Sequence, residues 1–262
     1  MQRNAQFTKR NPFTLAVLTI SLVAISRLVF AEGPSVARMV FFNAKPGSKA
    51  PLEEAIKKHV AVRREETNQW RWLTWEYASG EVPRYCVATF GHAWAEFDHP
   101  PAGGQAELAV DAASMLAATP PVAQYFEHLD EVSDFGTQTN TPTLVEISTF
   151  QLHYGKTGQF YAALREFHDA LSRGGGVNRY EWFELRSGGD TPQFMLMVPR
   201  ANWEALDTNA DLFLNRLEKM LGKKKAAKLF EQFTSAVKGH QRSVVRLRPD
   251  LSLLPTRKGA EQ

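Results

Sequence analysis

Two glutamates and one histidine are the residues of this chain best suited by type to move a proton. Glu76 and Glu184 stand at equivalent points of two similar segments, and His153 ends an apolar run in the second segment. Carboxylates and imidazoles act as general bases when a pocket holds them against a substrate. We therefore take Glu184 and His153 as the candidate catalytic residues. The simpler alternative is that the two glutamates form ion pairs, with Arg71 or Arg179, that hold the fold together.

Aromatic side chains are dense around these glutamates, and those at every second position of a strand share one face. If that face lines a cavity, it forms an aromatic pocket to which polar residues of neighbouring strands contribute. The candidate ligand-binding residues are Trp72, Glu76, Tyr180, Trp182, Gln151 and Asn43. Aromatic residues also favour strands without binding anything, so packing in a core is the simpler interpretation.

The histidines and the single cysteine form no recognisable metal motif. No pair of histidines has the His-x-x-x-His spacing, and a polar loop explains His92, Asp98 and His99 as well as a metal does. Cys86 falls within a predicted strand, which indicates core packing and excludes an intrachain disulfide. Motifs for binding phosphate or dinucleotides are absent from the sequence. We predict no metal and no cofactor.

The first thirty-one residues resemble an export signal. Arg3, Lys9 and Arg10 give a basic start, an apolar stretch covers residues 13–25, and Val29-Phe30-Ala31 offers a cleavage site before Glu32. A competing site precedes Arg27, and an uncleaved membrane anchor is the alternative. The apolar stretch is shorter than the about 20 residues that a membrane span needs. We expect cleavage, a periplasmic or secreted protein, and no stable membrane insertion afterwards.

Composition and charge exclude several classes of protein. The chain has 262 residues, 44% of them hydrophobic and 23% charged, which is typical of a globular protein and not of a disordered one. The export signal holds four of the 31 basic residues and none of the 28 acidic ones, so the rest of the chain is close to neutral. The basic pI therefore gives no reason to expect a nucleic-acid partner. The lysine cluster at residues 219–228 is interpreted as a solvated helix face, with docking to an anionic surface as the alternative.

The two halves of the chain resemble each other. Laying Glu76 on Glu184 also matches an upstream Phe, Gly, Ala and Arg, and with small gaps it matches residues 123–127 to 227–231. The order of the matches, with gaps only in predicted loops, indicates a tandem duplication. We divide the chain into a leader (1–31), a first repeat (32–143), a second repeat (144–248) and a loose tail (249–262).

Each half is predicted to run strand, helix, two-strand hairpin, helical region, strand. The predicted strands cover residues 37–45, 70–78, 84–90 and 135–141 in the first half, and 144–153, 178–186, 193–198 and 241–248 in the second. In the first half, Thr119 is suited to cap a helix and Pro120 to begin it, so the later helical piece is placed there. This βαββαβ order is the ferredoxin-like arrangement. Two such units can bury their bare sheet faces against each other, so we predict an α+β fold in which two ferredoxin-like repeats form one pseudo-dimeric barrel.

The second half also resembles a known superfamily. The segments Tyr180-Glu-Trp-Phe-Glu-Leu-Arg-Ser, Pro192-Gln-Phe-Met-Leu-Met-Val and Trp203-Glu-Ala-Leu-Asp are similar to the dimeric α+β barrel superfamily, with antibiotic-biosynthesis monooxygenase-like and NIPSNAP-like proteins as the nearest families. The resemblance implies a fold and leaves activity open, because the superfamily includes oxygenases, isomerases, haem enzymes and binding proteins.

We therefore expect an exported barrel protein that binds a small apolar or aromatic molecule in its interior. The alternative is a cofactor-free monooxygenase or isomerase with Glu184 or His153 as general base. Because the duplication supplies both halves in one chain, no oligomer is required. A third alternative is a solidly packed barrel that works through its surface.

Overall fold

We analysed the chain as a computed structural model, which describes residues 35–64, 70–99, 117–118, 120–134, 141–174, 179–206 and 210–254. The predicted leader lies outside the described residues. So do residues 100–116, where the second helical region of the first half was expected, and nearly all of the predicted strand over 135–141.

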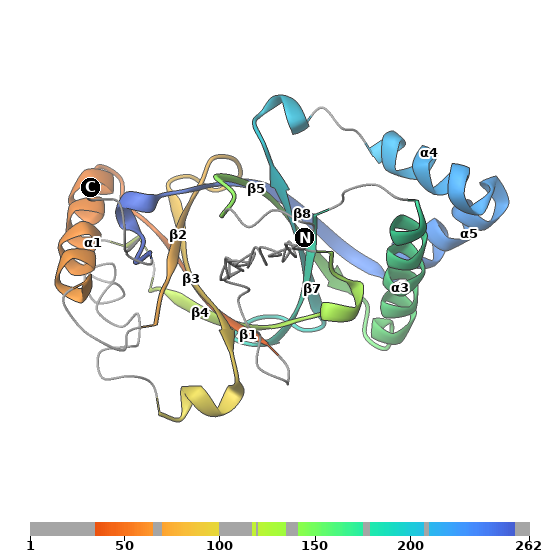
Figure 1. The fold of residues 1–262 in the computed structure, drawn as a ribbon. Coiled ribbons are helices and arrows are strands. Elements are labelled where there is room, and N and C mark those ends of the chain that lie inside the picture. Colours follow the sequence, from red (N-terminus) through yellow and green to blue (C-terminus); the bar gives the residue numbers. More distant parts are fainter. Residues whose placement is uncertain are drawn as a thin grey trace, which may run out of the picture.

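Eight strands close into one barrel in the order β1-β3-β2-β8-β5-β7-β6-β4, and all neighbours are antiparallel (Figure 1). The strands are β1 (Val36–Asn43), β2 (Leu73–Tyr77), β3 (Arg84–His92), β4 (Val122–His128), β5 (Leu144–Leu152), β6 (Glu181–Ser187), β7 (Gln193–Arg200) and β8 (Val237–Leu247). Closure leaves no sheet edge open, which removes the usual site of strand-to-strand aggregation.

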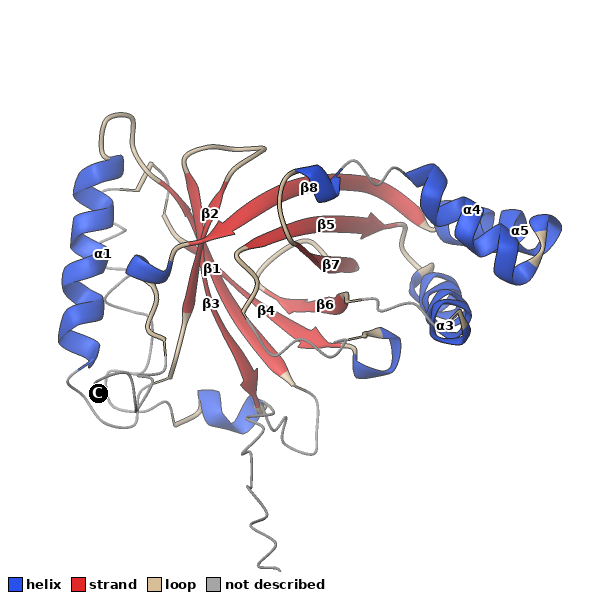
Figure 2. Ribbon diagram, turned by 45° about the horizontal axis from the view of Figure 1, so that its top comes forward, coloured by secondary structure: helices blue, strands red, loops and turns tan. Residues whose placement is uncertain are grey.

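The helices cover the outside of the barrel. They are α1 (Lys49–Arg64), α3 (Thr157–Arg173), α4 (Ala210–Leu221) and α5 (Lys223–Thr234), with short turns η1 (Trp94–Phe97), η2 (Asp130–Val132), η3 (Glu204–Leu206) and η4 (Pro249–Leu251). The helix α1 lies on one side and α3, α4 and α5 lie on the opposite side (Figure 2). The mixed α+β fold and the barrel that the sequence predicts are therefore confirmed.

Strand pairing is the same in both halves. In the first half β1 pairs with β3 and β4, and in the second β5 pairs in the same way with β7 and β8. The halves are joined by β2 with β8 and by β4 with β6. The edge strands of each half therefore pair with the edge strands of the other half. That the two halves are ferredoxin-like repeats remains a prediction.

A helical piece of the first half was predicted where the structure has a strand. The segment 122–128, expected to be helical after Thr119 and Pro120, is strand β4 between β1 and β6. The match of residues 123–127 to 227–231 is also wrong as a structural equivalence, because the second segment lies in helix α5. Pairing on both sides of β4 outweighs the local helix-start signals.

The C-terminal segment is packed as far as residue 254, which corrects the expectation of a loose tail from residue 249. Leu251 is fully buried and Leu253 nearly so, in a cluster with Trp72 and residues of α1. The indole Nε1 of Trp72 donates to the carbonyl of Leu251 at 3.3 Å, and the hydroxyl of Thr74 donates to the same carbonyl at 2.6 Å. This segment therefore closes the outer face of the first half.

Candidate functional site

The barrel interior is a core to which all eight strands contribute. Its buried residues are Ala37, Met39, Trp75, Tyr77, Cys86, Ala88, Phe126, Val145, Ile147, Phe183, Leu185, Met195, Met197, Val245 and Leu247. Two other clusters contain helix residues and therefore lie on the outer face. This division assigns the two faces of each strand, which alternation alone could not do.

A small cavity lies in this interior. Its volume is about 10 Å³, close to the smallest space that admits one water molecule and far below the about 300 Å³ of a small-ligand pocket. Met39, Met195 and Met197 line it together with Phe41 and Phe90. Methionine side chains have three rotatable torsions and adapt to irregular neighbours. The wall is therefore apolar and made of side chains that can move.

Trp75 carries a buried polar group beside this apolar cavity. Its side chain lines the cavity, the residue is 3% exposed, and its indole Nε1–H has no hydrogen-bond partner among the described residues. A buried donor without an acceptor costs about 1–3 kcal/mol. Such a group requires an explanation, and a guest with an acceptor oxygen is one.

Glu181 is an ionisable residue beside the cavity. It lies two positions before Phe183 on β6, which places it on the inner face, and it pairs across the sheet with Met197 of the cavity wall. Burial raises the pKa of its carboxyl, and the charge of Arg179 opposes this. A carboxyl with a raised pKa beside an apolar cavity is a candidate for proton transfer.

His128 and Asp130 form an ionisable pair at the barrel wall. The Nδ1 of His128 lies 2.7 Å from Oδ1 of Asp130, and the imidazole ring lies 4.9 Å from the ring of Phe183. Burial lowers the pKa of His128, and Asp130 opposes this. Burial therefore favours the neutral imidazole, and the Asp130 carboxylate holds the ring in one orientation.

The predicted site residues of β6 lie on the opposite face. Trp182 packs under α3 in the outer cluster, and Tyr180 lies against the same cluster, with its hydroxyl 3.0 Å from Nδ1 of His168. Glu184 is on the same outer face, with Oε2 3.2 Å from Arg186. Burial raises the pKa of Glu184 even there. Glu184 does form an ion pair, but the partner is Arg186 of its own strand and not Arg179, so this pair does not tie separate elements together as predicted.

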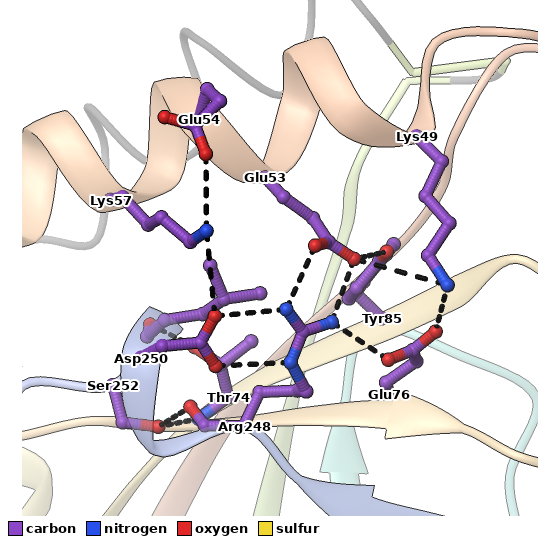
Figure 3. Close-up of polar contacts among 11 residues, drawn as sticks. Lys49, Glu53, Glu54, Lys57, Thr74, Glu76, Tyr85, Arg248, Asp250 and Ser252 are labelled. Atoms are coloured by element: carbon purple, nitrogen blue, oxygen red, sulfur yellow. Dashed lines mark hydrogen bonds and ion pairs between the residues drawn. The ribbon is translucent and has the colours of Figure 1, made fainter.

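The predicted site residues in and next to β2 also lie on the outer face of the barrel. Trp72 packs against α1 and the C-terminal segment, and Glu76 joins an ion network around Arg248 (Figure 3). The Arg248 guanidinium lies 2.8 Å from Oε2 of Glu76, 2.7 and 2.8 Å from the carboxylate of Glu53, and 2.9 Å from Asp250. Glu76 therefore ties β2 to α1 and the C-terminal segment, through Arg248 and not through Arg71.

The three predicted residues of β1 and β5 do not meet the cavity. Asn43 and Gln151 are half-buried, two positions beyond Phe41 and Thr149 on the inward face, at the ends of their strands. His153 follows β5 and is exposed. The structure therefore does not bring Glu184 and His153 together.

The other histidine and cysteine predictions can also be located. Cys86 lies in the interior core, as predicted, and burial raises the pKa of its thiol to about 12. His92 is buried with Nδ1 3.0 Å from Glu96 and its ring 4.2 Å from that of Trp70, while Asp98 and His99 are exposed. Within the described ranges, no three His, Cys, Asp or Glu residues are grouped so as to hold a metal ion.

Sequence reasoning therefore selected the wrong face of two strands. Trp75 and Glu181 are the inner neighbours of Glu76 and Trp182, one position away on the chain. The signal that could have found Glu181 is a comparison of the halves, because the repeat lays this carboxylate on apolar Leu73. An ionisable residue in place of a core leucine indicates a specific role.

Comparison with known proteins finds similar folds and no similar sequences. No protein-family model matches the chain, and no curated protein matches it in sequence. A proposed monooxygenase from Lactobacillus acidophilus has a similar structure, with a TM-score of 0.55 and 11% identity over 82% of this chain and 94% of that chain. A second proposed monooxygenase, from Fusobacterium nucleatum, gives a TM-score of 0.54 and 10% identity over 83% and 94%. An anthrone oxidase-like protein gives 0.55 and 9% over 87% and 97%.

The barrel and its helices define an α+β barrel protein, and these similar structures share that fold. Each similarity covers more than four-fifths of both chains, so it includes both halves of the barrel. At such low identity it shows the fold and leaves the chemistry to the residues of the site.

Proposed function

We propose that the barrel interior binds a small apolar or aromatic molecule that carries an acceptor oxygen. The observation that carries this proposal is the buried indole N–H of Trp75, which has no acceptor among the described residues and belongs to a side chain that lines an apolar cavity. An acceptor on the guest removes the cost of this unpaired donor, and the apolar wall removes the rest of the guest from water.

Binding requires the methionines of the wall to move. A cavity of about 10 Å³ is too small for an aromatic molecule. Rotation of Met39, Met195 and Met197 enlarges it without changing the strands, because these side chains are unbranched. The guest therefore binds by replacing contacts between side chains, and the empty barrel is closed.

The test compares Trp75 of β2 with Trp72, which directly precedes this strand. Native mass spectrometry of the protein purified from its own host is expected to show a retained small molecule. Trp75→Phe removes the unpaired donor together with part of a buried ring, so we expect about ten-fold weaker retention and some loss of stability, as for any large-to-small core substitution. Trp72→Phe is the control, because its Nε1–H donates to Leu251 outside the barrel. It should lower stability and leave retention unchanged.

The proposal is overturned if the protein purified from its host retains no small molecule and also fails to bind added anthrone or 1,4-naphthoquinone. Equal loss of retention in both variants also overturns it, because that result indicates general unfolding instead of a contact with Trp75.

Glu181 supports a second function, cofactor-free oxygenation. A buried carboxylate can take the proton of an activated C–H next to a carbonyl, and the resulting enolate can pass electrons to dioxygen. With anthrone the balance is one anthrone and one O₂ to one anthraquinone and one water. Two of the similar structures are proposed monooxygenases and one is an anthrone oxidase-like protein, which supports testing this substrate.

Oxygen uptake with anthrone tests this second function. Glu181→Gln should abolish uptake above the uncatalysed rate, whereas Glu184→Gln, on the outer face of the same strand, should retain it. Uptake that is absent in the unaltered protein, or that survives Glu181→Gln, rejects oxygenation by Glu181 and leaves the binding proposal intact.

Export of the protein is also proposed, with the two halves as ferredoxin-like repeats from one duplication. The basic start, apolar stretch and Val-x-Ala motif support export, and the identical strand pairing of the halves supports duplication. N-terminal sequencing of the mature protein should begin at Glu32, or at Arg27 if the competing site is used. Intact Met1 recovered from the membrane fraction overturns export.

A further inference from the structure

The hairpin of α4 and α5 carries the densest positive charge of the chain. The two helices lie at the end of the molecule opposite α1, beside α3 (Figures 1 and 2). Residues 213–231 hold six basic and two acidic side chains, namely Arg216, Lys219, Lys223, Lys224, Lys225 and Lys228 against Glu218 and Glu231. The five lysines are exposed.

The inner face of α5 is fixed by packing. Ala226 and Leu229 are buried in the outer cluster of the second half, and Gln159 of α3 donates to the carbonyl of Gln232 at 2.7 Å. The lysines therefore project from the opposite side of a helix that is held in place.

The lysine charge is mostly uncompensated within the fold. Lys225 lies 3.5 Å from Glu166, and no other lysine of the cluster has an ion pair with a described residue. Lys223, Lys224 and Lys225 fill the first turn of α5, which has no acidic residue. Positive charges at this end of a helix repel each other and the helix dipole. An external anionic partner would remove this repulsion.

We propose that the α4–α5 hairpin docks the protein on the surface of a bilayer containing anionic phospholipids. Lysine ammonium groups are mobile point charges, which suit a fluid array of headgroups better than the fixed geometry of one ligand. Half-buried Met220 and Leu221 lie between the two lysine groups and pack against the outer cluster, so the contact with the bilayer is made by the lysines. None of the helices within the described ranges is long and apolar enough to cross a membrane, so the binding is peripheral.

A flotation assay with vesicles tests this docking. The protein should float with phosphatidylcholine vesicles that contain phosphatidylglycerol, should not float with phosphatidylcholine alone, and should be released by high salt. The test variant replaces four residues together, Lys223→Gln, Lys224→Gln, Lys225→Gln and Lys228→Gln. At the usual contribution of each lysine, binding should weaken on the order of 100-fold or more.

A matched control removes the same charge elsewhere. Lys58→Gln, Arg71→Gln, Lys238→Gln and Arg246→Gln, all on exposed residues, should weaken binding much less. The melting temperature of the cluster variant should be unchanged or higher, because repulsion in the first turn of α5 is removed. Failure of the unaltered protein to bind anionic vesicles at low salt overturns the proposal. Equal loss in both variants, or binding to duplex DNA in place of vesicles, also overturns it.

Discussion

Arg248, the last residue of the predicted second repeat, has a charged side chain that pairs with three carboxylates. Its guanidinium contacts the carboxylates of Glu53, Glu76 and Asp250, which come from α1, β2 and the C-terminal segment (Figure 3). The hydrogen bond from Arg248 lowers the pKa of Glu53 to about 2, with burial opposing it. At the residue scale, one arginine therefore joins three elements that are distant in sequence.

This pKa shift predicts how acid affects stability. The folded-state pKa of Glu53 is below its unfolded value, so its stabilisation is present above pH 4.5 and is lost as the pH falls toward 2. Glu53→Gln should lower the free energy of unfolding at pH 7 by about 2–3 kcal/mol and flatten its dependence on pH in this range.

The neighbouring glutamate provides the control, with urea denaturation at several pH values as the measurement. Glu54 is exposed and lies 3.0 Å from Lys57, so Glu54→Gln should change stability by less than about 0.5 kcal/mol. A similar acid dependence in both variants would contradict the role of the Arg248 network.

At the scale of elements, the sequence predicts where strands lie better than it predicts which face of a strand points into the barrel. Strand positions in β1, β3, β5 and β7 were predicted to within a few residues because turn signals bound each strand. The inner face of β6 was not predicted correctly, because Trp182 packs under helices while Phe183 packs inside the barrel. A strand buried on both faces has apolar residues on both, so its alternation cannot show which face is inside.

The C-terminal turn η4 provides a prediction for an element that the sequence did not identify. Leu251 is fully buried between β2 and α1, so Leu251→Ala should lower the free energy of unfolding by about 3 kcal/mol. Pro249→Ala, at an exposed position of the same turn, should change it by less than about 0.5 kcal/mol. Urea denaturation of both variants measures this. Equal effects would mean that the turn does not close the outer face.

The whole barrel depends on pairing between the halves. Strand β2 pairs with β8 and strand β4 with β6, and the interior core draws on all eight strands. Opposite net charges, with 9 basic and 15 acidic residues in 32–143 and 18 and 13 in 144–262, favour the same closure. Repeat pattern and charge thus predicted the assembly, although neither predicted which side chains fill its interior.

Separating the halves tests this closure. Residues 32–142 expressed alone should be insoluble or self-associating, because β2 and β4 become open edges and the inner face becomes exposed. Size-exclusion chromatography with light scattering measures this. A stable, well-folded monomer would contradict a barrel shared by both halves.

The indole N–H signal of Trp75 tests the central claim most directly. In a ¹H–¹⁵N spectrum, the signal is assigned by its loss in Trp75→Phe, and the protein is then titrated with anthrone or 1,4-naphthoquinone, which both offer a carbonyl acceptor. We expect the Trp75 indole proton to move downfield while that of Trp72, already bonded to Leu251, stays in place. A Trp75 signal that does not move at saturating concentrations of either compound would contradict the barrel interior as the binding site.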